Sequence, residues 1–238
     1  MKPSPPSPPS PPSPPSPPSP EHPHAAAMRH LGAADDRMAE LIARAGPCRL
    51  GLHASGAFAR QELLTALVEA IVSQQLSPRA ADTIFARARA LIDGDGTLTP
   101  ELLLALPEEK LRGAGLSGAK ARSVRDLCEH VLRGDLVLEA LHAMEDEAAI
   151  TALSRVRGIG RWTAEMVLMF QLGRPDVLPV GDLGVQKGFM KLFGLRQLPA
   201  APRMVKLAKP FRPYRSVACW YLWRINEEKA AVAAKQAR

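Results

Sequence analysis

The sequence predicts an all-α fold, and three observations lead to that prediction. From Asp35 onward, apolar residues recur at three- and four-residue steps, the spacing of one face of a helix. No segment alternates between apolar and polar residues as a half-buried strand would. Aromatic residues, which strands favour, make up only 5% of the 238 residues, whereas 46% of the chain is hydrophobic and can fill a core.

The first 23 residues differ in composition from the rest of the chain. They hold 13 of its 23 prolines, mostly as a Ser-Pro-Pro repeat. Such a repeat favours extended polyproline II structure and offers no apolar surface to a core. We therefore expect residues 1–27 to be a disordered spacer, 28–228 to fold, and 229–238 to fray. We expect neither a secretory signal nor a membrane span, because no sufficiently long apolar run is present.

Two apolar stripes predict the first helices of the folded part. Met38, Leu41 and Ile42 form a short amphipathic helix that ends at Gly46-Pro47. A firmer stripe predicts a second helix, which runs into the corner Gln74-Gln75-Leu76. Its members are Leu63, Leu64, Leu67, Val68, Ile71 and Val72.

Helix start signals then repeat along the chain. Ser77 and Pro78 restart a helix as its N-cap and first turn, and Thr99-Pro100 and Leu106-Pro107 repeat this signal. Ser117 caps a further helix, in which basic side chains either contact a DNA backbone or form a solvated face. These side chains are Lys120, Arg122 and Arg125.

A glycine hairpin follows a helix marked by Ile150 and Val156. Two glycines around one apolar residue, as in Gly158-Ile159-Gly160, allow a tight turn and a close approach of the backbone to a ligand. The unpaired amides of the next helix, together with Arg161, favour an anion such as a DNA phosphate. Glycines that merely join two packed helices give the same pattern, so the hairpin alone leaves both interpretations open.

A loop rich in glycine and proline leads from the second helix of the hairpin to Asp182, and a basic helix begins at Leu183. An aspartate at this position is a good N-cap. A cap position favours the ionised form of the carboxylate, so Asp182 could also serve as a fixed negative charge.

The stretch from Leu153 to Gly188 resembles the signature of the helix-hairpin-helix, Gly/Pro-loop, Asp superfamily of DNA glycosylases, and within it the 3-methyladenine DNA glycosylase II (alkyladenine) branch. Arg157 departs from the pattern, since many relatives carry proline there. The likeness extends from about Asp35 to Asn226. The matching residues are Gly158, Gly160, Trp162, Thr163, Ala164, Pro179, Asp182 and Lys187.

The resemblance implies a two-domain helix-hairpin-helix fold with its active site between the domains. The hairpin subdomain would span roughly 60–175, and the other would combine 28–59 with 176–228. It also implies that Asp182 is catalytic and that the base pocket contains Trp162, Trp223 and Met166, although Met166 also fits a core position. Relatives that nick DNA carry a lysine in place of Trp162, so a glycosylase without lyase activity is expected here.

The resemblance further implies contacts with double-stranded DNA that contains alkylated bases. Gln75 matches the residue that wedges into the base stack, and Leu76 is its neighbour. The expected DNA-binding residues are Gln74, Gln75, Leu76, Ser77, Lys120, Gly158, Ile159, Gly160, Arg161, Thr163, Lys187, Arg212 and Arg215.

Charge and cysteine content agree with a DNA-binding protein inside a cell. The formal net charge of +7 and the pI near 9.7 favour a polyanionic partner. Cys48, Cys128 and Cys219 are far apart and suit buried thiols in a reducing compartment. No metal-ligand spacing is present, which argues against the iron-sulfur cluster of some relatives. We expect no cofactor other than a monovalent cation on the hairpin carbonyls, and a monomer.

The function expected from these residues is excision of alkylated purines, such as 3-methyladenine and 7-methylguanine, in base excision repair. Two alternatives remain at this point. One is a non-catalytic helix-hairpin-helix DNA-binding protein, although phosphate binding alone needs neither Asp182 nor two pocket tryptophans. The other is a glycosylase for another base lesion.

Overall fold

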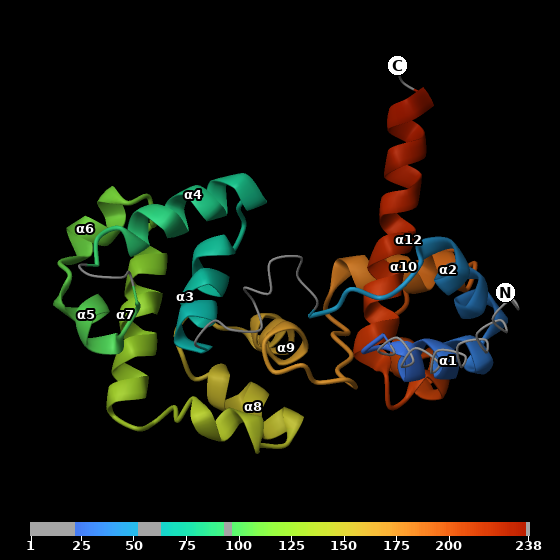
Figure 1. Ribbon diagram of the computed structural model, residues 1–238, viewed down its shortest axis with the longest axis horizontal. Coiled ribbons are helices and arrows are strands. Elements are labelled where there is room, and N and C mark those ends of the chain that lie inside the picture. The colour runs from blue at the N-terminus through green and yellow to red at the C-terminus, as the bar shows by residue number, and fades with distance from the viewer. Residues whose placement is uncertain (1–21, 52–62, 93–96, 237–238) are drawn as a thin grey trace, which may run out of the picture.

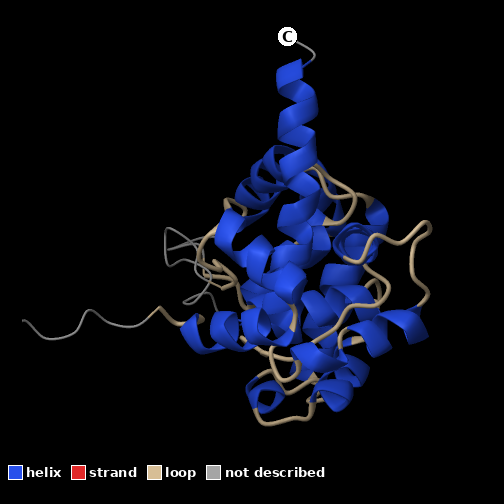
Figure 2. Ribbon diagram, turned by 90° about the vertical axis from the view of Figure 1, so that its right-hand side faces the viewer, coloured by secondary structure: helices blue, strands red, loops and turns tan. Residues whose placement is uncertain are grey.

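The computed structural model describes residues 22–51, 63–92 and 97–236, with side chains up to Glu227. Within these ranges every regular element is a helix, which confirms the all-α prediction (Figure 2). Residues 1–21 of the predicted tail lie outside the described residues. None of the helices searched in the described ranges is both long and apolar enough to cross a membrane.

The first two helices, α1 (Ala25–Ala34) and α2 (Asp36–Ala45), pack against each other. The predicted tail boundary at residue 27 was therefore wrong. Alanine is the best helix former, and Ala27 is buried with 4% of its surface exposed. Gly46 ends α2 with φ +75°, as the sequence predicts.

A group of helices from the middle of the chain lies on the left in Figure 1. The predicted caps are confirmed, since the side chains of Ser77, Thr99 and Ser117 each accept a bond from a backbone N–H three residues further on. Burial of apolar side chains such as Leu67 and Leu127 holds the group together. Its helices are α3 (Leu63–Ser73), α4 (Pro78–Arg89), α5 (Pro100–Ala105), α6 (Glu108–Gly113) and α7 (Gly118–Leu132).

The two helices of the hairpin follow a 3-10 turn at Glu139–His142. They are α8 (Asp146–Leu153) and α9 (Arg161–Phe170). In Figure 1, α9 stands between the left-hand group and the helices on the right, and α3 is also in contact with it. The N-terminal end of α9 is thus placed where both halves of the molecule can contribute to a site.

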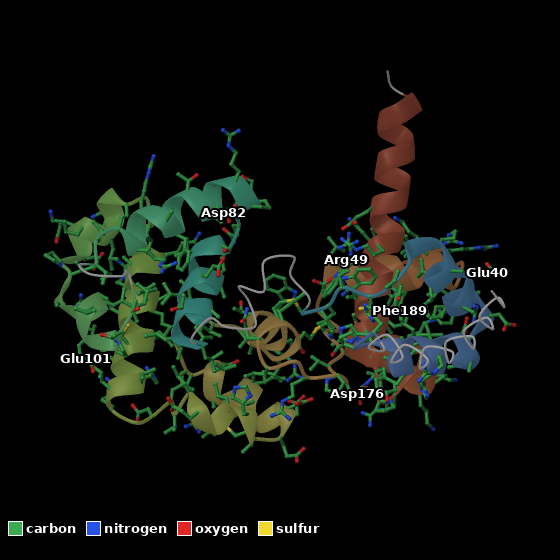
Figure 3. The ribbon with its side chains drawn as sticks, viewed as in Figure 1. Glu40, Arg49, Asp82, Glu101, Asp176 and Phe189 are labelled. Atoms are coloured by element: carbon green, nitrogen blue, oxygen red, sulfur yellow. The ribbon has the colours of Figure 1, made fainter. Side chains whose placement is uncertain are left out.

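The right-hand group combines both ends of the chain, because α12 packs on α10, α2 and α1. The Tyr221 hydroxyl donates to the carbonyl of Gly46 (3.0 Å), and Phe189 is fully buried in the same group (Figure 3). Its later elements are α10 (Leu183–Leu192), α11 (Ala201–Leu207), the 3-10 turn Lys209–Phe211 and α12 (Arg215–Gln236). The last helix includes residues 229–236, which we expected to fray. Alanine and lysine favour helix there.

Candidate active site

The glycine hairpin between α8 and α9 is tight for a reason that the structure makes explicit. Gly158 has φ +79°, and a Cβ at this position would lie 2.5 Å from Oγ of Ser123 on α7. Gly160 is the N-cap of α9 and caps it without a side chain. The backbone N–H of Arg157 donates to the carboxylate of Asp126 on α7 (2.7 Å), so a hydrogen bond joins the hairpin to that helix. The first glycine is required by both its conformation and its packing.

The carboxylate of Asp182 is the centre of the candidate site. Its Oδ2 accepts a bond from Nε1 of Trp162 (2.8 Å), and its Oδ1 accepts from Nε1 of Trp223 (2.9 Å) and the backbone N–H of Val185 (2.7 Å). The last bond makes Asp182 the N-cap of α10, as predicted. All three partners are donors, which suits an ionised carboxylate, because a protonated carboxyl would need an acceptor for its own hydrogen. Helices α9, α10 and α12 therefore meet at one anion.

The indoles of Trp162 and Trp223 differ in their exposure to solvent and in their packing. Trp162 is 47% exposed and is bound to Asp182 through its ring edge. Trp223 is half-buried and stacks on Phe170 with ring centroids 5.9 Å apart and an interplanar angle of 18°. Its Cδ1 would lie 2.7 Å from a Cβ at Gly184, so the start of α10 packs closely beneath it. Trp223 is thus fixed by Phe170 and by the start of α10, whereas Trp162 is exposed to solvent.

An apolar cavity of about 590 Å³ lies between α3 and α9. Met166, one turn after Trp162, and Phe170, one turn further, belong to its lining. Met166 is half-buried and also packs against the hydrophobic core, as a core position would, and its role in a base pocket stays a prediction. The cavity adjoins the tryptophan site, because Phe170 contacts both.

The corner between α3 and α4 is tied to the hairpin. Nε2 of Gln74 donates to the carbonyl of Gly158 (2.8 Å) and lies 3.5 Å from the Thr163 hydroxyl. The next residue, Gln75, is exposed and has φ +56°. Leu76 is 37% exposed. The structure thus brings the predicted wedge corner and the predicted phosphate-binding turn together.

Comparison with known proteins agrees with this geometry. Residues 68–213 match the model of the HhH-GPD superfamily of base excision DNA repair proteins. The chain belongs to this superfamily. It is 32% identical to the alkylbase DNA glycosidase-like protein mag2 of Schizosaccharomyces pombe, over 84% of this chain and 92% of the relative.

Solved structures of superfamily members superpose on most of the chain. The 3-methyladenine DNA glycosylase Mag1 of Schizosaccharomyces pombe, in complex with abasic DNA, is 31% identical with a TM-score of 0.74, covering 85% of this chain and 97% of that one. A DNA-3-methyladenine glycosidase from Bacillus halodurans is 38% identical with a TM-score of 0.73, covering 84% and 88%. The resemblance inferred from the Leu153–Gly188 stretch is therefore confirmed.

Three arginines that we expected at the DNA backbone each lie within 4 Å of a carboxylate. Arg161 bonds Glu147 through two nitrogens and also bonds Glu165 (3.0 Å). All three arginines line a cavity of about 630 Å³ whose described lining also carries five carboxylates. Those carboxylates belong to Glu145, Asp146, Glu147, Glu165 and Asp176.

The other two arginines of this cavity meet at Asp176, which is labelled in Figure 3. Arg215 bonds both carboxylate oxygens of Asp176 (2.7 and 2.9 Å) and has a side chain only 13% exposed, so little of its guanidinium is available to a phosphate. Arg212 lies 3.8 Å from the same carboxylate with a side chain 63% exposed, and its DNA contact stays a prediction. Burial raises the pKa of Glu165, although its ion pair with Arg161 opposes this shift.

Lys120 also has a different environment from the one we expected. Its ammonium donates to the carbonyls of Val72 and Gln74, both at 2.7 Å, instead of projecting into solvent as a free phosphate ligand would. Arg125 likewise donates to the carbonyls of Leu104 and Leu106, so its guanidinium is bonded within the protein instead of standing on a fully solvated face. Lys187 is exposed on α10 and remains a candidate DNA contact.

Sequence reasoning missed two residues that shape the site. Phe170, which stacks on Trp223, lies eight residues after Trp162 on the same helix face, so helical spacing contained a signal for it. Asn226 donates to the carbonyl of Gly184 (2.8 Å) and joins α12 to the first turn of α10. That contact is between distant segments, and nothing local in the sequence indicates it.

The cysteine and metal predictions concern other parts of the molecule. Cys48, Cys128 and Cys219 are buried free thiols, and burial raises the pKa of Cys48 and of Cys128 to about 12. Among the residues that the structure describes, no group of three or more His, Cys, Asp or Glu side chains is arranged to hold a metal ion.

Proposed function

We propose that this protein is a monofunctional DNA glycosylase that removes alkylated purines by hydrolysis of the N-glycosidic bond. The observation that carries the proposal is the Asp182 carboxylate, held by the indole N–H groups of Trp162 and Trp223 at the start of α10. The names of the relatives support it, since these include 3-methyladenine DNA glycosylases of similar fold. A protein that only bound phosphates would need none of these three side chains.

The chemistry begins with extrusion of the base, because its reacting carbon is inaccessible in a duplex. Departure of the base leaves an oxocarbenium-like sugar, which a fixed negative charge stabilises. Asp182 supplies that charge. Three donors already orient its carboxylate, so it need not reorganise as the sugar cation forms. The same carboxylate orients or deprotonates the water that completes hydrolysis.

Because a tryptophan stands at position 162, we expect hydrolysis of the glycosidic bond without strand cleavage. An indole has no nucleophilic amine, so it cannot form the Schiff base that a lysine at this position would form. The product is then an abasic site in an intact strand.

The tryptophans also favour a cationic substrate. A purine alkylated at N3 or N7 is positively charged, and an aromatic face attracts a cation by about 0.5–2 kcal/mol. Trp162 is exposed enough to offer its face, whereas Phe170 covers one face of Trp223. Because a cationic base is a good leaving group, Asp182 suffices without a strong general acid.

DNA contacts follow from the same arrangement. The hairpin backbone and the start of α9 would bind a phosphate, with Lys187 and Arg212 as further cationic contacts, and the exposed Gln75 would fill the gap left by the flipped base. We place the protein with DNA inside the cell, acting as a monomer. A monovalent cation at the hairpin carbonyls would be its only cofactor.

Base release from methylated DNA tests this proposal directly. DNA treated with a methylating agent is incubated with the protein, and the released bases are separated by chromatography. We expect 3-methyladenine and 7-methylguanine in the supernatant and no covalent adduct when borohydride is added. Release of only oxidised or mismatched bases from parallel substrates would indicate another lesion. An adduct trapped by borohydride would contradict the monofunctional assignment.

A further inference from the structure

The corner at Gln75 holds an uncommon backbone conformation. Its φ of +56° lies in the left-handed region, which residues other than glycine rarely adopt, and its side chain is exposed. Among the described residues it is the only non-glycine residue with a positive φ. Such a conformation persists only where the surroundings enforce it, and it is common at functional sites.

Lys120 provides one of the constraints on this corner. Its Nζ reaches from α7 to the last turn of α3, where it donates to the carbonyls of Val72 and Gln74, each at 2.7 Å. Carbonyls at the end of a helix lack partners within that helix, and a cation there is favoured by the helix dipole. The two bonded carbonyls lie three residues and one residue before Gln75, so the ammonium fixes the chain up to that residue. Burial lowers the pKa of Lys120, in keeping with this enclosed position.

Gln74 provides a second constraint from the opposite side. Its amide donates to the carbonyl of Gly158 in the hairpin (2.8 Å), while its own carbonyl accepts from Lys120. Helices α3 and α7 and the hairpin thus converge on the residue before Gln75. A rearrangement of the backbone at this residue would therefore break hydrogen bonds to the Lys120 ammonium or to the hairpin.

We propose that Lys120 is a positioning residue for base extrusion, which holds the Gln75 backbone in the conformation that presents its side chain to the DNA. This inference rests on the proposed glycosylase function, because it assigns the use of the corner to flipping a base. It replaces the role of Lys120 as a phosphate ligand, since two of its three N–H donors are already bonded within the protein.

The roles of Lys120 as a phosphate ligand and as a positioning residue predict different effects of salt on DNA affinity and of base pairing on base release. A phosphate ligand contributes about one unit to the slope of log affinity against log salt, whatever the state of the lesion. A positioning residue leaves that slope unchanged, but it matters most where a paired base must be extruded. Lys120→Met removes the donors and retains much of the side-chain volume. Lys120→Arg retains both charge and donors. Lys110→Met removes one exposed lysine of α6 and serves as the control for charge.

The test measures single-turnover base release from a lesion in a duplex and from the same lesion in an unpaired loop. We expect Lys120→Met to slow duplex release about 10- to 100-fold, the range for loss of hydrogen bonds to a charged donor. Release from the loop should change less than threefold. Lys120→Arg should recover part of the duplex activity, and Lys110→Met should match the wild type. Equal losses on both substrates, or a salt slope smaller by about one unit for Lys120→Met, would overturn the proposal.

Two further measurements keep the test decisive. Gln74→Leu breaks the other constraint, and we expect the same duplex-specific loss even if Lys120→Met unfolds. Fluorescence of 2-aminopurine opposite an abasic site reports insertion at the corner without any catalysis. If the wild type changed the fluorescence and Lys120→Met did not, but the wild type released no base, the glycosylase function alone would be contradicted. Unchanged fluorescence in both variants would contradict the role of Lys120.

Discussion

Substitution of Gly158 by alanine tests the account of the hairpin. The backbone there has φ +79°, which costs a residue with a Cβ about 1–2 kcal/mol. The new methyl group would also lie 2.5 Å from Oγ and 3.2 Å from Cβ of Ser123, and overpacking of this kind costs about 1–3 kcal/mol. We therefore expect Gly158→Ala to reduce the free energy of unfolding by about 2–5 kcal/mol, the sum of those two ranges.

Gly160→Ala is the matched control, because both glycines flank Ile159 in the same turn. Gly160 has φ −86°, and among the described residues beyond its chain neighbours no atom comes within 4 Å of a Cβ built there. Its only expected cost is a poorer N-cap, about 1 kcal/mol or less. Ser123→Ala in the Gly158→Ala background removes the closer of the two contacts. It should restore part of the loss, while the conformational cost remains.

Urea denaturation followed by circular dichroism measures these differences, and binding to abasic DNA reports whether the turn still forms. The expected order of stability is wild type, Gly160→Ala, the Gly158→Ala/Ser123→Ala double variant and Gly158→Ala. If Gly158→Ala were as stable as Gly160→Ala, neither the left-handed conformation nor the contact with Ser123 would constrain the hairpin. The packing argument for the first glycine would then be wrong.

Three other outcomes follow from the structure. Trp223→Phe preserves an aromatic ring beside Phe170 but removes a donor to Asp182. Single-turnover base release should therefore fall about tenfold, as expected for the loss of one hydrogen bond to a charged group. Unchanged release would show that this bond is dispensable. Deletion of residues 1–21 should leave the melting temperature and the activity unchanged, since a Ser-Pro-Pro repeat has no apolar surface to bury, and a clear drop in either would show that the segment contributes. Gln75→Ala should slow release from a duplex more than from an unpaired lesion, whereas a duplex-specific loss for Leu76→Ala alone would move the wedge to that residue.

Local signals in the sequence were sufficient for most of the helices. Caps such as Ser77 and Ser117 act within three residues, so their effect can be predicted without tertiary contacts. The start of α1 could not be placed in this way, because alanines after a proline-rich segment give no cap signal. Ala27 and Leu31 are buried, and contacts of the helix with α2, α12 and the 3-10 turn Lys209–Phe211 fix its place. The family signature located Asp182 and Trp162 for the same local reason, since both lie in one contiguous stretch.

The partners of the basic side chains could not be predicted from the sequence. A positive charge near a hairpin suggests a phosphate, yet Arg161 is bound by Glu147, which lies fourteen residues earlier, and Arg215 is bound by Asp176. Lys120 reaches a carbonyl 48 residues before it. Whether a cation faces DNA or another part of the protein depends on such long-range packing, which neither composition nor spacing specifies.

The central claim, that the Asp182 carboxylate stabilises the sugar as the base departs, is tested most directly by Asp182→Asn in single-turnover release from methylated DNA. Asparagine also caps a helix well and can still accept from Val185 and Trp223, but its amide loses the charge and the bond from Trp162. Trp162→Phe loses that bond but keeps an aromatic face and the charge of Asp182, and so serves as the comparison. We expect Asp182→Asn to keep its melting temperature and its DNA affinity while release falls by about 100-fold or more, and Trp162→Phe to lose less. A folded Asp182→Asn protein that released bases at a near-normal rate would contradict the claim.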